Sequence, residues 1–218
     1  MRDVRMLGII DMNRNAVLDI YIKNQIENFS EEEREEELYE VWGSNWSNVE
    51  GWEFLSSEIK ESINNGTLPE DYKDKKYDSV LFFKFRDRFK GFRNDYLSIQ
   101  TGLRINSGNP TKLESCPCCG MKTIEKRYDF EICTVCWWED DGQDNENSDT
   151  ILGGPNYGLS LTKGRLNFLR HGIYDPERND LIEIKDEPNK FEKGRSFEIQ
   201  NNFLIELGTE WKTKITNA

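Results

Sequence analysis

Five cysteines lie close together in the second half of the chain, and four of them form two Cys-x-x-Cys pairs. The first pair is Cys116 and Cys119, the second is Cys133 and Cys136, and residues 120–132 separate them. Each pair places two thiolates on one tight turn, so two facing turns can supply four sulfurs to one ion. Four sulfur ligands at this spacing are typical of a structural, tetrahedral zinc site. The spacing therefore predicts a zinc-stabilised fold with these four cysteines as the metal ligands.

Turn-forming residues support the first pair better than the second. Pro117 fixes φ at about −65° in the first turn, and Gly120 can adopt the positive φ that closes it. In the second turn Thr134 stands where a proline could, and Trp137 stands where the first turn has its glycine. Between the pairs, residues 121–132 alternate in a way that predicts two short strands joined by a turn, which together form a zinc-ribbon hairpin.

Three other uses of these cysteines are open. Residues 116–119 have the order of a glutaredoxin-type redox motif, but no helix pattern follows Gly120, as that chemistry requires. Disulfides are disfavoured because no secretory signal precedes the cysteines. Iron also suits four thiolates and is kept as a substitute for zinc. Cys118 belongs to neither pair, and we expect it to point away from the ion. The alternative is a redox-sensitive thiol or a substitute ligand.

The first half of the chain has the periodicity of helices. Apolar residues recur three or four apart from Asn15 to Phe29 and predict a first helix. Ser30 and Glu33 form the capping-box pattern of a second helix, which begins with an acidic run. A third helix is expected over 52–63, with Trp46 packed nearby.

The clearest periodicity lies in residues 77–100. One helical face there carries Leu81, Phe82, Phe85, Phe89, Phe92 and Tyr96. Basic residues from Lys84 to Arg93 flank this face. Exposed rings between basic residues could stack on single-stranded nucleic acid. We expect instead that the rings are buried, that the basic residues form a rim, and that Gly91 splits the helix in two.

The chain is acidic, with a net charge of −12 and a pI of about 4.8. Residues 116–158 contribute 3 basic and 9 acidic side chains. An acidic ribbon is poorly suited to a phosphate backbone, whose affinity for proteins comes largely from Lys and Arg. A basic protein partner is therefore expected, and nucleic acid less so. No apolar run reaches the length of a bilayer span, so we expect a cytoplasmic protein without a membrane partner.

The remaining residues provide no recognisable catalytic set. Ser160 is the expected cap of a helix that ends at Gly172, and residues 197–207 suggest a strand or a closing helix. The single histidine, His171, lies in the last turn of the Ser160 helix. One histidine excludes an HExxH site and argues against a Ser-His-Asp triad. We therefore expect no catalytic residues and no enzyme activity.

Several separated motifs occur in order between residues 114 and 175. They are Cys116–Gly120, Glu131–Gln143, Gly153–Asn156, Ser160-Leu161, Arg165 and Asn167-Phe168. Together these motifs resemble the bacterial cysteine-rich CPCC family. The resemblance implies a small zinc-ribbon-like bacterial module, often joined to other domains and without a settled activity. It also suggests a link to toxin-neutralising (immunity) proteins.

These observations predict an α+β protein in two domains. Residues 1–108 are the expected helical N-terminal domain, and residues 109–218 the expected zinc-ribbon domain, with a β-hairpin, four cysteines and one or two helices. The turn-rich stretch 106–111 is the expected linker. The predicted function is that of a non-catalytic, zinc-stabilised protein-binding module, with toxin neutralisation as a candidate role. The alternatives are a nucleic-acid-associated zinc-ribbon regulator that uses the basic rim, and a thiol redox protein that uses Cys116 or Cys118.

Overall fold

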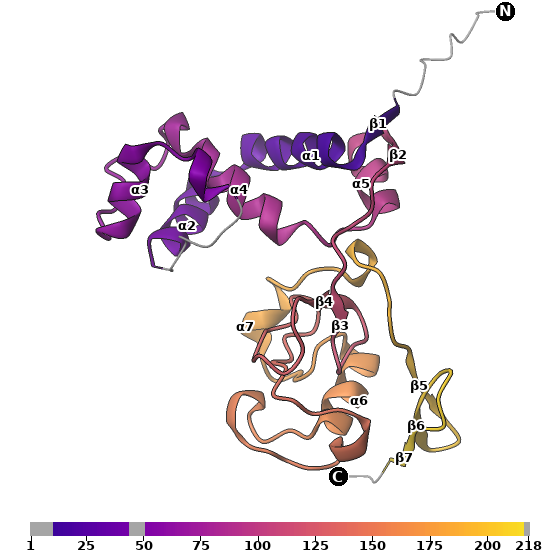
Figure 1. Cartoon of the computed structure of the whole chain (residues 1–218). Helices are drawn as coiled ribbons and strands as arrows, with labels where there is room; N and C mark the ends of the chain where they lie inside the picture. Colours follow the sequence, from indigo (N-terminus) through magenta and orange to yellow (C-terminus); the bar gives the residue numbers. More distant parts are fainter. Residues whose placement is uncertain (1–10, 44–50, 216–218) are drawn as a thin grey trace, which may run out of the picture. The chain divides into compact units, whose positions relative to one another are not determined.

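The computed structural model describes residues 11–43 and 51–215. The chain divides into two compact units, Met1–Pro110 and Thr111–Ala218. Helices dominate the first unit, whereas the second contains short sheets, two helices and a cluster of four cysteines (Figure 1). The predicted α+β fold class is therefore confirmed. Trp46, which was expected to pack beside the third helix, lies outside the described residues.

The first unit contains five α-helices and one two-stranded sheet within its described residues. The helices are α1 (Arg14–Asn28), α2 (Glu31–Trp42), α3 (Ser57–Asn64), α4 (Asp78–Arg88) and α5 (Asn94–Thr101). Two 3₁₀ turns, η1 (Trp52–Phe54) and η2 (Lys75–Tyr77), precede α3 and α4. Strand β1 (Asp11–Asn13) pairs in parallel with β2 (Arg104–Ser107), so the two ends of the described part of this unit lie side by side (Figure 1).

Local capping explains where the first helices begin. The Asn13 side chain accepts a hydrogen bond from the N–H of Ala16 at 2.9 Å and caps α1. Ser30 and Glu33 make the predicted capping box at the start of α2, with bonds of 3.1 and 2.8 Å. Each bond satisfies a backbone N–H that the first helical turn leaves without a partner. The third predicted helix is shorter than expected, because Ser56 caps α3 and separates it from η1.

Aromatic rings form much of the core between α1, α4 and α5. Phe85 stacks on Phe89 with ring centroids 5.1 Å apart, and Phe89 stacks on Phe92 at 4.7 Å. Tyr21 from α1 meets Phe89 edge-on at 5.5 Å. All four side chains are buried. Most of the predicted aromatic face is therefore core, whereas Phe82 and Tyr96 are only half-buried. The chain breaks between α4 and α5 around Gly91, as the sequence indicates.

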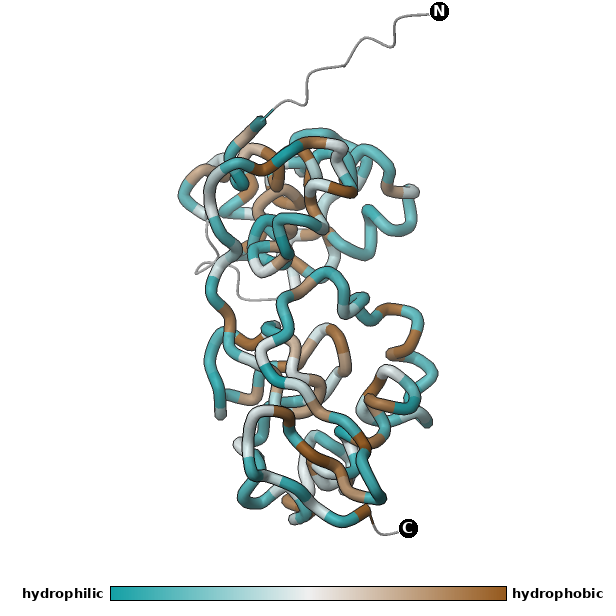
Figure 2. Tube along the Cα trace, turned by 90° about the vertical axis from the view of Figure 1, so that its right-hand side faces the viewer, coloured by the Kyte–Doolittle hydropathy of each residue, from teal (hydrophilic) through white to brown (hydrophobic). Residues whose placement is uncertain are grey.

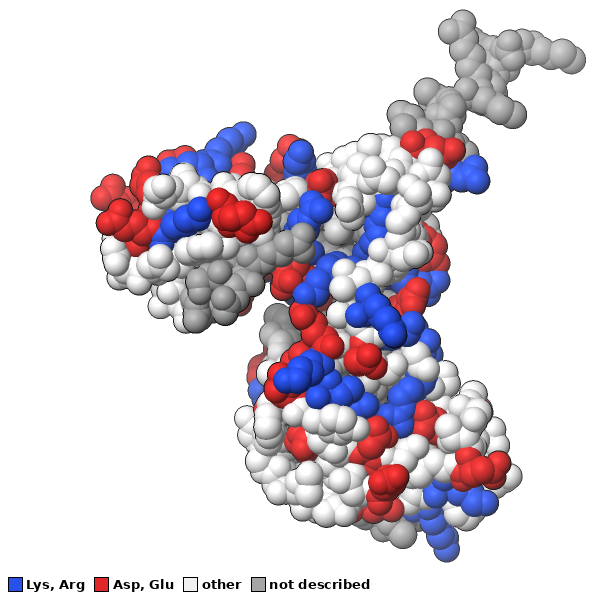
Figure 3. Space-filling view, viewed as in Figure 1, with Lys and Arg blue, Asp and Glu red and all other residues white. Residues whose placement is uncertain are grey.

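The basic rim of this aromatic face is taken up by ion pairs within the unit. Lys84 is 8% exposed, and its ammonium lies 2.6 Å from Glu37 and 2.7 Å from Glu40 of α2. Arg86 pairs with Asp19 of α1 at 2.5 Å. On the face that Figure 3 shows, Lys and Arg are interspersed with Asp and Glu. These pairs fasten α4 to α1 and α2 and leave less basic charge for a phosphate backbone.

The second unit is a series of short elements. Its strands are β3 (Glu114–Ser115), β4 (Lys122–Ile124), β5 (Phe197–Gln200), β6 (Phe203–Glu206) and β7 (Lys212–Lys214). Its helices are α6 (Leu161–His171) and the single-turn α7 (Asn179–Ile182), with 3₁₀ turns η3 (Asn145–Asn147), η4 (Gly154–Asn156) and η5 (Pro188–Lys190). Ser160 caps α6 and Gly172 ends it, as predicted.

The prediction that two strands between the cysteine pairs form a hairpin is wrong. β4 pairs antiparallel with β3, which precedes the first cysteine pair, and not with a strand downstream. The second expected strand does not form because Tyr128 and Phe130 have positive φ angles of 66° and 60°. Extended strands need negative φ, so alternating apolarity alone cannot make this stretch a strand. Ile132 instead makes an isolated antiparallel bridge to Glu139.

The three-stranded sheet β5-β6-β7 packs on α6. Leu166 of α6 forms a buried cluster with Phe197, Leu204 and Ile215, and Trp211 packs against it.

None of the described helices is both long and apolar enough to cross a bilayer. The hydropathy-coloured trace agrees, since hydrophobic residues are interspersed with hydrophilic ones along the helices (Figure 2).

Candidate metal centre

The first cysteine pair lies on a tight turn, the first knuckle (residues 116–120), that directly follows β3. Its ends are tied by two backbone bonds, from Cys116 N–H to Met121 C=O at 2.8 Å and from Gly120 N–H to Cys116 C=O at 2.9 Å. Gly120 has φ = 79°. A Cβ at this position would lie 2.1 Å from the backbone oxygen of Arg195. Glycine is therefore required at this position for two reasons: the left-handed backbone and the close approach of a neighbouring chain segment.

The second cysteine pair lies on a turn of the same kind, the second knuckle (residues 133–137). The Trp137 N–H donates to Cys133 C=O at 2.7 Å, and the Cys133 N–H donates to Trp138 C=O at 2.9 Å. Trp137 has φ = 65°, a conformation that non-glycine residues rarely adopt. The second knuckle thus closes without the proline and glycine that help the first.

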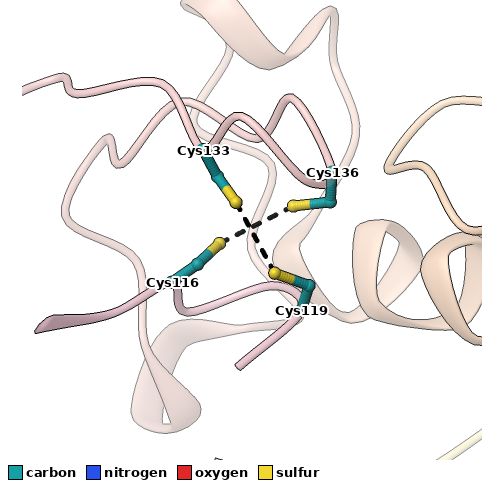
Figure 4. A group of neighbouring side chains, drawn as sticks. All are labelled: Cys116, Cys119, Cys133 and Cys136. Carbon is teal, nitrogen blue, oxygen red and sulfur yellow. Dashed lines mark hydrogen bonds between the residues drawn. The ribbon is translucent and has the colours of Figure 1, made fainter. Parts of the chain in front are cut away.

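The two knuckles bring all four predicted cysteine sulfurs together (Figure 4). The Cys116 and Cys136 sulfurs are 3.6 Å apart, as are those of Cys119 and Cys133. All four sulfurs lie within 4.8 Å of one another. None of these cysteines forms a disulfide, and the separations far exceed the S–S bond length of about 2.05 Å. The disulfide alternative is therefore wrong.

The spacing of the sulfurs fits a tetrahedral ion. Zinc–sulfur bonds of about 2.3 Å place the sulfurs of a regular tetrahedron about 3.8 Å apart. The two measured separations of 3.6 Å are close to that value. A donor set of four thiolates also fits Zn²⁺ and iron better than magnesium or calcium, which prefer oxygen. The residues present therefore fit either zinc or iron held by four thiolates.

Burial and hydrogen bonding shift the pKa values of the four thiols in opposite directions. Burial raises the pKa of Cys116, Cys119 and Cys136. Cys133 is equally buried, but the hydrogen bonds it accepts from the other cysteines and from Thr123 hold its pKa well below the usual range. The Thr123 hydroxyl lies 3.0 Å from the Cys133 sulfur. Four buried thiolates without a cation would repel one another, so this pocket of sulfurs is suited to a positive ion.

Cys118 lies outside the four-sulfur group. Its side chain is buried, and a Cβ added to Gly164 of α6 would lie 3.4 Å from its sulfur. Each of the five cysteines is at most 1% exposed. A thiol that attacks a substrate needs access to it, so this burial argues against redox catalysis by Cys116 or Cys118.

The comparison with protein families fits this geometry. Residues 114–189 match the Cysteine-rich CPCC family. This segment, the CPCC segment, includes β3, β4, both knuckles, α6 and α7. No curated protein and no solved structure matches the chain. The family match thus covers the cysteine centre and leaves the helical unit and the C-terminal sheet outside it.

A buried arginine connects the CPCC segment to the C-terminal sheet. Arg165 of α6 is 0% exposed and donates to Pro117 C=O in the first knuckle at 2.8 Å. Its guanidinium contacts two aromatic rings that meet edge-on, 4.2 Å from the centroid of Phe197 and 4.6 Å from that of Trp211. A second bond of 2.8 Å joins it to Asn145. The arginine therefore holds the first knuckle, α6 and the sheet together.

A network of ion pairs surrounds this arginine. Arg195 donates to both Asp144 oxygens, at 2.8 and 3.1 Å, and to both Glu206 oxygens, at 2.7 and 2.9 Å. Hydrogen bonds from Arg195 lower the pKa of Glu206. Burial opposes ionisation of Asp144, but its bonds to Arg195 outweigh this effect and lower its pKa too. The Arg195–Asp144 pair spans 51 positions and the Asn145–Glu206 bond spans 61, so no local sequence pattern could have identified these residues.

Proposed function

We propose that the four clustered cysteines bind one zinc ion whose role is structural. The observation that carries this proposal is the closed donor set: four buried sulfurs would fill all four positions of a tetrahedral ion. Catalytic zinc sites use three protein ligands and keep the fourth position for water or substrate. When bound, the ion supplies folding energy. The chain's own contribution is to hold the sulfurs in place through the two knuckles.

Metal analysis and spectroscopy test the structural role. The chain purified with zinc is expected to contain one zinc per molecule. After replacement by Co²⁺, the visible spectrum should be that of a tetrahedral sulfur site and should not change when imidazole or azide is added. A spectrum that responds to these small ligands would indicate an open position and would contradict a purely structural site.

We further propose that the chain is a non-catalytic module that binds a basic protein. The support is the net charge of −12, the 9 acidic against 3 basic side chains in residues 116–158, and the lack of a catalytic set among the described residues. An acidic surface attracts a basic partner through steering that salt weakens. Toxin neutralisation is the narrower form of this proposal, in which the basic partner is a toxic enzyme.

Affinity capture tests this binding function. The zinc-loaded chain, immobilised and exposed to extract of its host, should retain a protein of basic pI. The purified candidate should then bind the chain with an association rate that falls as salt is raised. Toxin neutralisation predicts in addition that co-expression of the chain restores growth of cells that produce the partner. Retention of nucleic acid in place of protein would contradict the proposal.

The nucleic-acid alternative receives less support. Its stacking surface would be the aromatic face of α4 and the following residues, yet Phe85, Phe89 and Phe92 are buried. The flanking Lys84 and Arg86 are engaged with Glu37, Glu40 and Asp19. Stacking on bases requires exposed rings. An electrophoretic mobility shift at low salt remains the direct test, and we expect no salt-sensitive complex with DNA or RNA.

A further inference from the structure

A pocket of about 400 Å³ opens beside the second knuckle. Aromatic and aliphatic side chains make up most of its wall: Trp137, Tyr157, Tyr174, Ile132 and Leu181. The knuckle holds one wall in place, because the Trp137 N–H bonds to Cys133 C=O at 2.7 Å. The bridge between Ile132 and Glu139 holds the neighbouring wall. The pocket is thus built on the metal-binding scaffold.

Two polar groups in this pocket have no partner in the described part of the chain. The indole Nε1–H of Trp137 is buried and has no acceptor there. The Glu139 side chain also lines the pocket, and no hydrogen bond or ion pair to its carboxylate is found among residues 11–43 and 51–215. A buried donor without an acceptor costs about 1–3 kcal/mol. The Glu139 carboxylate therefore remains available to a ligand, whereas the indole N–H is enclosed by the chain itself.

The backbone of two wall residues is strained. Trp137 and Tyr157 have φ angles of 65° and 51°, and neither is glycine. Left-handed conformations cost such residues about 1–2 kcal/mol each. Tyr157 is also 69% exposed, so burial of its ring does not compensate for this cost. The Trp137 conformation closes the second knuckle and that of Tyr157 ends the η4 turn, so these two backbone conformations set the shape of the pocket wall.

The pocket already contains one example of cation binding. The guanidinium of Arg178 lies 5.0 Å from the centroid of the Tyr157 ring. Asp180 neutralises this guanidinium through two hydrogen bonds of 2.9 and 2.7 Å. Because Arg178 pairs with Asp180, it does not neutralise the Glu139 carboxylate. The pocket therefore retains a negative charge next to aromatic walls. Aromatic faces with a carboxylate attract Lys, Arg and other organic cations.

We propose that this pocket receives a Lys or Arg side chain from an extended segment of a basic protein partner. The cation pairs with Glu139 against the rings of Trp137 and Tyr157. The positive charge of a basic partner complements this carboxylate. The inference rests on the proposed binding of a basic protein and names the place where that protein is recognised.

Nuclear magnetic resonance of the full, zinc-loaded chain tests this inference directly. The probes are N-acetyl-Gly-Arg-Gly-amide, its Lys counterpart and the neutral Gln counterpart. The Arg and Lys peptides should shift the Trp137 indole Nε1–H resonance in a saturable manner, and the Gln peptide should bind about fivefold more weakly, since it lacks the charge. Equal binding of the Gln peptide, or an unchanged indole resonance, would overturn the proposal.

Three variants locate the effect in the pocket. Glu139→Gln should weaken binding of the Arg peptide about fivefold, whereas Glu146→Gln, the same change at an exposed residue outside the pocket, should leave it unchanged. Tyr157→Ala should weaken binding and Tyr157→Phe should retain it, because the ring face is kept. A captured partner that binds wild type and Glu139→Gln equally would overturn the pocket assignment alone. Failure to capture any basic protein would count against the function itself.

Discussion

Gly120 and Trp137 occupy equivalent positions in the two knuckles. Each directly follows the second cysteine of its pair, each has a positive φ, and each donates its N–H to the carbonyl of the first cysteine. The four-sulfur geometry thus requires a left-handed residue at both places. Glycine meets this requirement without strain in the first knuckle. In the second knuckle a tryptophan adopts the same conformation and contributes its ring to the adjoining pocket.

Replacing Gly120 by alanine is expected to destabilise the second unit strongly. The new Cβ would lie 2.1 Å from the backbone oxygen of Arg195, so the chain must shift. The left-handed backbone adds a cost of about 1 kcal/mol, and we expect a total loss of about 3 kcal/mol or more. Urea unfolding of the zinc-loaded protein measures this loss.

Gly172→Ala is the matched control for this variant. Gly172 also has a left-handed backbone, with φ = 74° and ψ = 14°, but the nearest atom to a Cβ there would be the Lys185 ammonium at 3.9 Å, an ordinary contact. It should therefore show only the backbone cost of about 1 kcal/mol. Equal losses for the two variants would mean that the contact with Arg195 is unimportant.

Replacing Cys133 by serine is expected to unfold the second unit and leave the first unit helical. The variant removes one of four ligands, and structural zinc provides about 10 kcal/mol or more of folding energy in small zinc-binding modules. Metal analysis should show loss of zinc, while circular dichroism should retain the signal of α1–α5.

Cys118→Ser provides the comparison, since it removes a buried thiol that lies outside the four-sulfur group. This variant should retain one zinc per chain and unfold as cooperatively as the wild type, with a modest loss of stability. If Cys133→Ser melted like the wild type with its metal bound, the four-ligand site would be refuted. Loss of zinc from Cys118→Ser would instead make Cys118 a ligand.

Local patterns were sufficient to predict several parts of this fold. The capping box of Ser30 and Glu33, the α6 cap at Ser160 and the split at Gly91 each depend on residues a few positions apart. The two Cys-x-x-Cys turns are also local, and turn geometry directs both sulfurs of a pair to one side. Convergence of the two pairs could therefore be predicted from spacing alone.

Longer-range features could not be predicted in this way. The alternation over 121–132 indicated a second strand, but positive φ at Tyr128 and Phe130 prevents it. Hydrogen bonds to Asp140 explain these two backbone conformations. The Asp140 carboxylate accepts the Tyr128 N–H at 2.8 Å, and the Asp140 carbonyl accepts the Phe130 N–H at 3.2 Å. Likewise, the role of Arg165 depends on partners in the first knuckle and the C-terminal sheet. Such contacts depend on tertiary packing, which a single sequence does not reveal.

Replacing Arg165 by alanine is expected to weaken both the fold and metal retention. The change removes the bond to Pro117 in the first knuckle and the contacts of the guanidinium with the rings of Phe197 and Trp211. Breaking a buried charge network of this kind costs about 3–5 kcal/mol. Zinc transfer to a chelator with a coloured complex should be faster than in wild type. Arg170→Ala, at an exposed position of the same helix, should leave the transfer rate unchanged. An unchanged rate for Arg165→Ala would show that this residue does not support the knuckle.

Acid is expected to destabilise the second unit through Glu206 and Asp144. Hydrogen bonds from Arg195 hold the pKa of Glu206 below its usual value, and Asp144 is shifted in the same direction despite its burial. A carboxyl whose pKa is lower in the folded state stabilises the fold fully above its unfolded pKa of about 4. That contribution is lost as the pH falls through the folded value.

Urea unfolding between pH 6 and pH 3 measures this dependence. Glu206→Gln should be less stable than wild type at pH 6, because Arg195 loses a charged partner, and the difference should shrink as the pH falls. Because protonation of the cysteines releases the metal, the two proteins are compared at those pH values at which metal analysis shows zinc still bound. Glu210→Gln, at an exposed residue just beyond β6, should follow the wild-type curve throughout. A difference between Glu206→Gln and wild type that stayed constant with pH would mean that the carboxylate stabilises the sheet by packing and not by its charge.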